Sequence, residues 1–154
     1  MMVDWLSWCL SASLAWGTPA GASAVLHDWD DRRTRAWASA DPHALRSLYV
    51  PGSAAGRADA AMLQAWHRRG LRVVGMRMQV LDLDVRRASD ERLDLVVTDR
   101  LVGAVTVGPG VRLPLPRDGF TTRHLVLVRD GGRWRVRQAS AARSTSWTVR
   151  SRNE

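Results

Sequence analysis

The sequence predicts a single α+β domain in which three N-terminal helices pack on a curved, cone-like antiparallel sheet of four to five strands. Apolar residues recur at helical spacing from Ala24 to Arg69, and from Leu71 onward they alternate as in β-strands. A length of 154 residues with 45% apolar content suits one domain with its own core. Residues 25–150 are therefore expected to form this domain, followed by a frayed tail at 151–154.

The helical half is expected to contain three segments. The first spans Ala24–Ala40, where apolar residues form one stripe. The second begins at Asp41, because an aspartate followed by proline suits a helix N-terminus, and it stops before Pro51. The third spans Asp59–Arg69, with Asp59 expected as its N-cap.

The remaining residues are expected to form long strands joined by turns. The slip in alternation at Val80-Leu81 predicts a β-bulge in the first strand. Gly108–Gly119 holds three prolines and is expected to be an extended loop, whereas Asp130-Gly131-Gly132 predicts a hairpin turn. The expected strands are Leu71–Arg86, Arg92–Val107, Phe120–Arg129 and Arg133–Ala139, with a short edge strand at Ser146–Arg150.

Residues 1–24 are expected to be a signal peptide or hydrophobic leader. The apolar stretch Val3–Trp16 is too short to span a bilayer, which takes about 20 residues, so no transmembrane span is expected. Ala22-Ser23-Ala24 fits a signal-peptidase site, so removal after Ala24 and export, or attachment to the cell envelope, are expected. The leader lacks the positively charged residues that usually begin a signal peptide. The alternative is therefore a cytoplasmic protein whose leader is an amphipathic helix that packs on the domain or on a membrane surface.

The positive charge is concentrated at the C-terminal end of the sequence. The net charge is +8, and all 23 basic residues are arginine, a composition that fits a GC-rich genome better than a specific nucleic-acid site. Arg133, Arg135 and Arg137 alternate along one strand, and Arg129 precedes the turn. They are expected to share a face that contacts anionic surfaces weakly and in a salt-sensitive way, or that is simply a solvated outer face.

Several segments resemble the nuclear transport factor 2-like superfamily, which includes ketosteroid isomerase and polyketide-cyclase-like proteins. They are the helical run RRTRAWASADPHALRSLY, the turn PGS, the middle segment RLDLVVTDRL, which looks like small exported actinobacterial members, and the closing hairpin LVLVRDGGRWRV. The resemblance covers about Val25 to Ala139. It implies a cone-shaped pocket and the option of a homodimer through the sheet. No catalytic residue of the superfamily is assigned to a position in this sequence.

Asp99 is the foremost candidate for a functional residue. It occupies one of the odd positions of the second expected strand, which otherwise hold Leu93, Leu95, Val97 and Leu101. A carboxylate on such a face is a general base or ligand anchor, one half of a buried ion pair with Arg77 as the proposed partner, or an acid at the strand end that reaches water. Tyr49 and His124 are weaker catalytic candidates. The expected pocket residues are Asp99, Tyr49, Trp37, Arg77 and His124.

Two functions follow from these residues. The sequence contains no nucleotide-binding, zinc-protease or nucleophile-elbow motif, so no cofactor or metal is expected. The favoured function is a non-catalytic exported domain that binds a small ligand or a partner protein in the cone. The alternative is a cofactor-free isomerase, cyclase or hydratase that uses Asp99 with Tyr49 or His124. It requires these three side chains to line one cavity.

Overall fold

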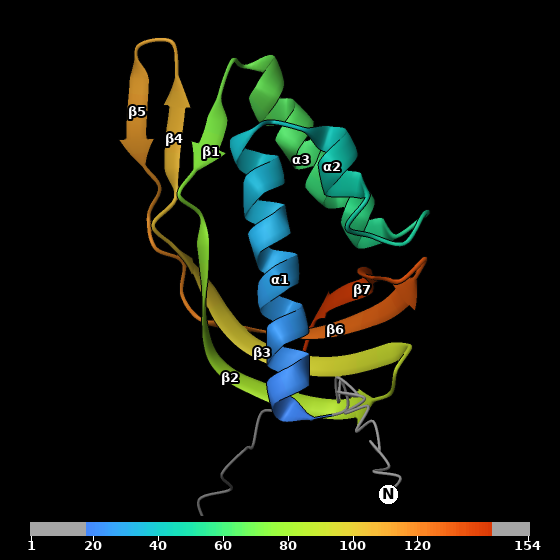
Figure 1. The fold of residues 1–154 in the computed structure, drawn as a ribbon. Helices are drawn as coiled ribbons and strands as arrows, with labels where there is room; N and C mark the ends of the chain where they lie inside the picture. The colour runs from blue at the N-terminus through green and yellow to red at the C-terminus, as the bar shows by residue number, and fades with distance from the viewer. Residues whose placement is uncertain (1–17, 143–154) are drawn as a thin grey trace, which may run out of the picture.

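The computed structural model describes residues 18–142 and shows three helices followed by two antiparallel sheets (Figure 1). The sheets are a four-stranded one, in the order β2-β3-β6-β7, and a three-stranded one, in the order β1-β4-β5. The α+β class and the three helices are confirmed, whereas the single sheet of four to five strands is not. The helices are α1 (Pro19–Ala38), α2 (Pro42–Arg46) and α3 (Ala54–Arg68), and the strands are β1 (Arg72–Val74), β2 (Arg77–Ala88), β3 (Arg92–Val102), β4 (Val105–Gly108), β5 (Val111–Pro114), β6 (Thr121–Asp130) and β7 (Arg133–Ala141).

Helix α1 starts earlier than the sequence predicted. Thr18 is its N-cap and accepts a hydrogen bond from the amide of Gly21 at 3.0 Å, and Pro19 occupies the first helical position. The expected cleavage bond after Ala24 therefore lies inside the helix, and Ala22 is fully buried in the core. The apolar leader Val3–Trp16 lies outside the described residues.

Helix α3 also begins before its expected start. Its N-cap is Ser53, which accepts from the amide of Gly56 at 3.3 Å. Asp59 is therefore not an N-cap but lies inside the helix, where it is buried. A buried carboxylate needs hydrogen-bonding partners, and those of Asp59 come from other elements.

The long strands confirm the alternation read from the sequence. Leu93, Leu95 and Val97 are fully buried on one face of β3, and Asp99, at 1% exposure, continues that face. The pairing of β2 with β3 shifts register between Val80 and Asp82, which confirms the predicted bulge and leaves Leu81 65% exposed. The predicted turn after Asp130 is also confirmed, because β6 and β7 are joined through Gly131 and Gly132, both with positive φ.

The small sheet was not anticipated. The strand expected over Arg92–Val107 is interrupted at Gly103, which has a φ of 70°, so β4 leaves the large sheet and pairs with β1. The expected loop Gly108–Gly119 contains β5, which pairs with β4 across a Pro-Gly turn. Its terminal Pro114 is tolerated because β5 is an edge strand, where a missing amide donor interrupts no ladder. The strand expected at Ser146–Arg150 and the tail fall outside the described residues.

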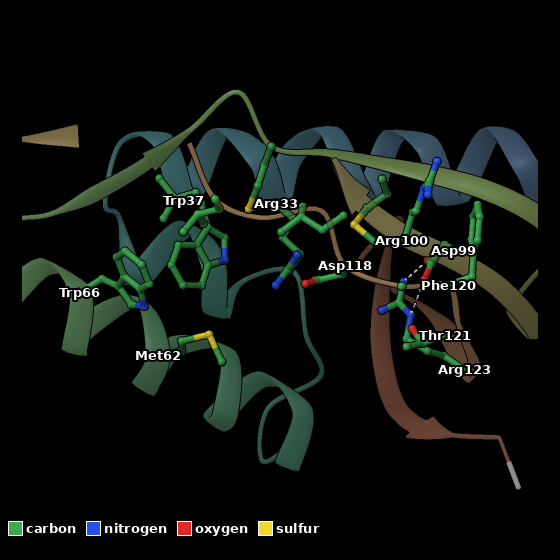
Figure 2. Close-up of a pocket in the computed structure, with 16 residues that line it drawn as sticks. Arg33, Trp37, Met62, Trp66, Asp99, Arg100, Asp118, Phe120, Thr121 and Arg123 are labelled. Carbon is green, nitrogen blue, oxygen red and sulfur yellow. Dashed lines mark hydrogen bonds and ion pairs between the residues drawn. The ribbon is translucent and has the colours of Figure 1, made fainter. Parts of the chain in front are cut away.

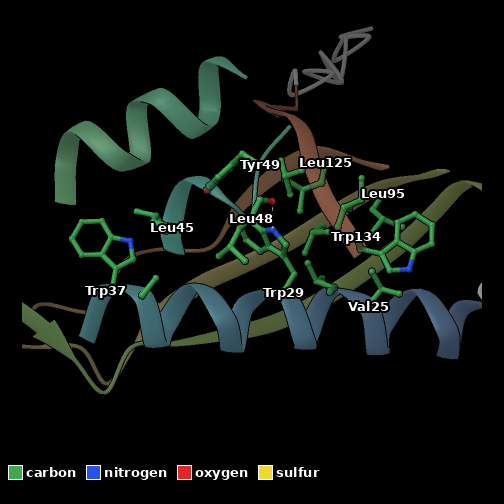
Figure 3. Packing of buried hydrophobic residues seen from close by; sticks show 14 of the residues in the cluster. Val25, Trp29, Trp37, Leu45, Leu48, Tyr49, Leu95, Leu125 and Trp134 are labelled. Atoms are coloured by element: carbon green, nitrogen blue, oxygen red, sulfur yellow. Dashed lines mark hydrogen bonds between the residues drawn. The ribbon is translucent and has the colours of Figure 1, made fainter. Parts of the chain in front are cut away.

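The large sheet curves around α1, and the helices cover one of its faces (Figure 1). The packed side chains include Trp29, Leu48 and Leu125, and the indole of Trp29 donates to the carbonyl of Leu48 at 2.9 Å (Figure 3). The segment after α2 joins β7 through two backbone hydrogen bonds to Val136, each 2.9 Å long. These contacts hold α2 against the sheet. Within residues 18–142, none of the helices is long and apolar enough to cross a membrane.

Candidate functional site: a cavity between the helices and the sheets

Buried Asp59 links three segments of the helical layer. Arg33 of α1 donates to it through Nε and Nη2, both at 2.7 Å. The Tyr49 hydroxyl donates at 2.7 Å and the Trp37 indole at 3.2 Å. Burial opposes the charge on Arg33, but the hydrogen bond and the negative charge of Asp59 outweigh it and raise the pKa of Arg33 above its usual range. Burial and the same carboxylate raise the pKa of the Tyr49 hydroxyl. Both groups therefore keep their protons.

A cavity of about 560 Å³ opens beside this cluster, between α1, α3, the strands and the loop before β6. One end is apolar, with Trp37, Trp66 and Met62, and Arg33 and Asp118 lie between it and the polar end (Figure 2). The volume lies within the range of small-molecule sites. The polar end is lined by Asp99, Arg100, Phe120, Thr121 and Arg123.

Asp99 forms an ion pair with Arg123 across neighbouring strands β3 and β6. The Nε atom of Arg123 donates to Oδ1 at 3.2 Å, and its Nη2 atom donates to Oδ2. Asp99 is 1% exposed, and the side chain of Arg123 is 28% exposed. The interpretation of Asp99 as half of a buried ion pair is confirmed, but the expected partner Arg77 is wrong. Arg77 is exposed at the start of β2. The partner is fixed by the pairing of β3 with β6, which places Arg123 opposite Val97 and diagonal to Asp99 on the same face.

The structure separates the other expected pocket residues. Asp99 and Trp37 line the cavity, whereas Tyr49, Arg77 and His124 do not. The hydroxyl of Tyr49 is held by Asp59, and His124 follows Arg123 on β6, where alternation turns it to the opposite face. The expectation of one cavity lined by Asp99, Tyr49 and His124 is therefore wrong.

Asp30 is a titratable group that the sequence analysis missed. It lies on α1 within electrostatic range of Arg123, Arg33 and Asp99, three residues that line the cavity. Burial raises the pKa of its carboxyl to about 6, and this outweighs the opposing effect of the two arginines. The spacing of Asp30, Arg33 and Trp37 on one helix face is the signal that could have revealed it.

The four hairpin arginines do not form the single strip expected from their alternation. Arg129 and Arg137 line one depression, and Arg133 lines another, together with Arg32 and Arg35. Arg135 lies 3.6 Å from Asp130. A bulge causes the division, because the pairing of β6 with β7 shifts register between Val126 and Leu127, opposite Arg137.

The residues described provide no metal centre: within 18–142 there is no group of three or more His, Cys, Asp and Glu side chains arranged to hold an ion. The polar groups of the cavity are instead arginines and aspartates, which offer ion pairs and hydrogen bonds.

Solved structures resemble this arrangement, although no family model and no curated protein matches the sequence. Aln2 from a Streptomyces species superposes with a TM-score of 0.54 at 17% identity, over 82% of this chain and 92% of its own. ActVI-ORFA from Streptomyces coelicolor superposes with a TM-score of 0.53 at 16% sequence identity, over 79% of this chain and 96% of its own. A dehydratase-like protein of the nuclear transport factor 2-like family from Streptomyces avermitilis superposes with a TM-score of 0.50 at 15% sequence identity, over 81% of this chain and 99% of its own. The chain therefore has the nuclear transport factor 2-like fold; at these identities no residue role is transferred.

Replacing Asp99 with asparagine should destabilise the domain, because Arg123 would lose the charge that compensates its own. Breaking a buried pair typically costs about 3–5 kcal/mol. The melting temperature of Asp99→Asn should therefore fall clearly below that of the parent. The double variant Asp99→Leu, Arg123→Met is the control, since exchanging both partners for apolar groups should recover much of the loss. An unchanged melting temperature for Asp99→Asn would contradict the structural role.

Replacing Asp30 with asparagine should stabilise the domain at neutral pH. The pKa of the Asp30 carboxyl rises from 3.8 to about 6 on folding, so the folded state binds this proton more tightly than the unfolded state does. The carboxyl therefore destabilises the folded state at a pH where it is ionised. The parent should lose stability as the pH rises from about 4 to about 6, by up to about 3 kcal/mol. Urea unfolding should show a gain for Asp30→Asn at pH 7 that disappears at pH 4.

The matched control for this experiment is Asp28→Asn, on the exposed side of the same helix, where the carboxylate side chain is 64% exposed. It should show no such pH-dependent gain. A constant difference between Asp30→Asn and the parent across pH 4–7 would show that Asp30 titrates normally.

Proposed function

We propose that this domain binds a small, mainly apolar molecule in its cavity and acts as a binding module rather than an enzyme. The observation that carries the proposal is the apolar end of the cavity, where Trp37 and Trp66 face a methionine-lined wall. Met62 is 56% exposed and Phe120 41% exposed. Large apolar side chains exposed around one hollow favour a ligand that covers them.

The charged groups support binding more than catalysis. Asp59 and Asp99 each hold an arginine through two hydrogen bonds, so both carboxylates serve to position guanidinium groups. Arg33 and Arg123 then line the cavity with their charges already compensated. The apolar stretch Val3–Trp16, which precedes α1 in the sequence, supports the further proposal that binding takes place outside the cytoplasm.

The alternative is a cofactor-free isomerase, cyclase or hydratase, and one observation favours it. The carboxyl of Asp30 has a pKa of about 6, which allows proton transfer near neutral pH. Asp30 would then replace the expected group of Asp99, Tyr49 and His124. Because Asp30 is not among the residues that line the cavity, ligand binding remains the favoured function.

The binding proposal is tested with N-phenyl-1-naphthylamine, an uncharged probe whose fluorescence rises in apolar surroundings. The parent should bind it saturably, and Trp66→Ala should weaken binding about tenfold, because the loss of one aromatic wall is worth roughly 1–2 kcal/mol. Leu81→Ala removes an exposed apolar side chain from outside the cavity and should bind like the parent. Equal affinity in all three proteins, or no saturable binding, would refute the proposal.

A further inference from the structure

Three arginines line a second depression that adjoins the cavity. Arg77, Arg100 and Arg117 surround a hollow of about 480 Å³, and no acidic side chain is among its lining residues. Within the part of the chain that the structure describes, none of the three forms an ion pair with a carboxylate. This separates them from Arg33 and Arg123, whose charges are compensated by Asp59 and Asp99.

The three arginines come from different elements, and two side chains hold Arg100 in place. Arg100 donates through Nε to the Gln79 side chain at 2.8 Å, and its guanidinium lies 4.4 Å from the centre of the Phe120 ring. A Cβ atom at Gly103 would lie 3.4 Å from the guanidinium of Arg77. Arg117 is exposed in the loop between β5 and β6. The three charges therefore come from separate elements and converge on one hollow.

The depression adjoins the polar end of the cavity, because Met78 and Arg100 line both. Arg100 and Phe120 lie at the end of the cavity away from Trp66 (Figure 2). A ligand that extends past Arg100 can therefore place an apolar part in the cavity and a charged group among the arginines. Asp118 is the nearby acid; it lines the cavity but not the depression, and it is exposed.

We propose that the ligand carries a phosphate monoester group, which Arg77, Arg100 and Arg117 bind at the polar end of the cavity. The inference rests on the proposed function, since it assigns the charged part of the same ligand. Three uncompensated like charges in one hollow repel each other, and a bound anion removes that repulsion. Guanidinium groups match phosphate geometry, and a phosphate offers three acceptor oxygens and close to two negative charges.

The test compares 2-naphthyl phosphate with 2-naphthol as competitors of N-phenyl-1-naphthylamine. Both should displace the probe. The phosphate ester should bind at least tenfold more tightly at low salt, and this advantage should shrink as salt is added. Inorganic phosphate should compete with 2-naphthyl phosphate and leave 2-naphthol unaffected.

The double variant Arg77→Gln, Arg117→Gln should lose the advantage of the phosphate ester while binding 2-naphthol normally. Arg100 is kept because it packs on Phe120. The charge-matched control is Arg133→Gln, Arg137→Gln, on the distant hairpin, which should retain the advantage. Melting temperatures should show that both double variants fold.

The outcomes separate the two proposals. If both naphthyl compounds bind with equal affinity, or if both double variants lose the advantage equally, the phosphate site is refuted and the apolar cavity stands. If neither compound displaces the probe and the probe itself does not bind, the cavity proposal fails. The phosphate site fails with it.

Discussion

The cluster around Asp59 is the interaction on which the helical layer depends. One buried carboxylate accepts hydrogen bonds from Arg33, Trp37 and Tyr49, so α1, α3 and the segment after α2 meet at a single residue. Gly56 allows the approach, since a Cβ atom there would lie 2.7 Å from the Tyr49 side chain. Without Asp59, a guanidinium and a hydroxyl would be left without their acceptor, at a cost of several kcal/mol. The same contacts hold Arg33 and Trp37 in the cavity wall.

The Asp99–Arg123 pair plays the corresponding part at the other end of the cavity. Two arginines are thus paired with buried carboxylates: Arg33 with Asp59 in the helical layer, and Arg123 with Asp99 in the large sheet. Charge inside the cavity is balanced at these two places, while the unpaired arginines gather beside its polar end. The apolar walls and the charged rim then define two different parts of one ligand.

Much of the fold could be predicted from the sequence because it rests on local periodicity. The change from helical to strand spacing, the bulge after Val80 and the inward face of Asp99 are properties of neighbouring residues. The small sheet was missed because one strand was expected to run on through Gly103, and because the prolines after Gly108 read as loop signals, although an edge strand tolerates them. The partners of Asp59 and Asp99 could not be predicted, since strand pairing and helix packing join residues 10 to 26 positions apart.

The tryptophans provide the most direct test of the account. Trp37 and Trp66 line the cavity, whereas Trp29 and Trp134 belong to the buried core away from it. Their indole N–H resonances can be followed by NMR while N-phenyl-1-naphthylamine is added. We predict that the resonances of Trp37 and Trp66 shift together, with one affinity, while those of Trp29 and Trp134 stay in place. Shifts confined to Trp29 and Trp134, or no shift at saturating probe, would contradict it.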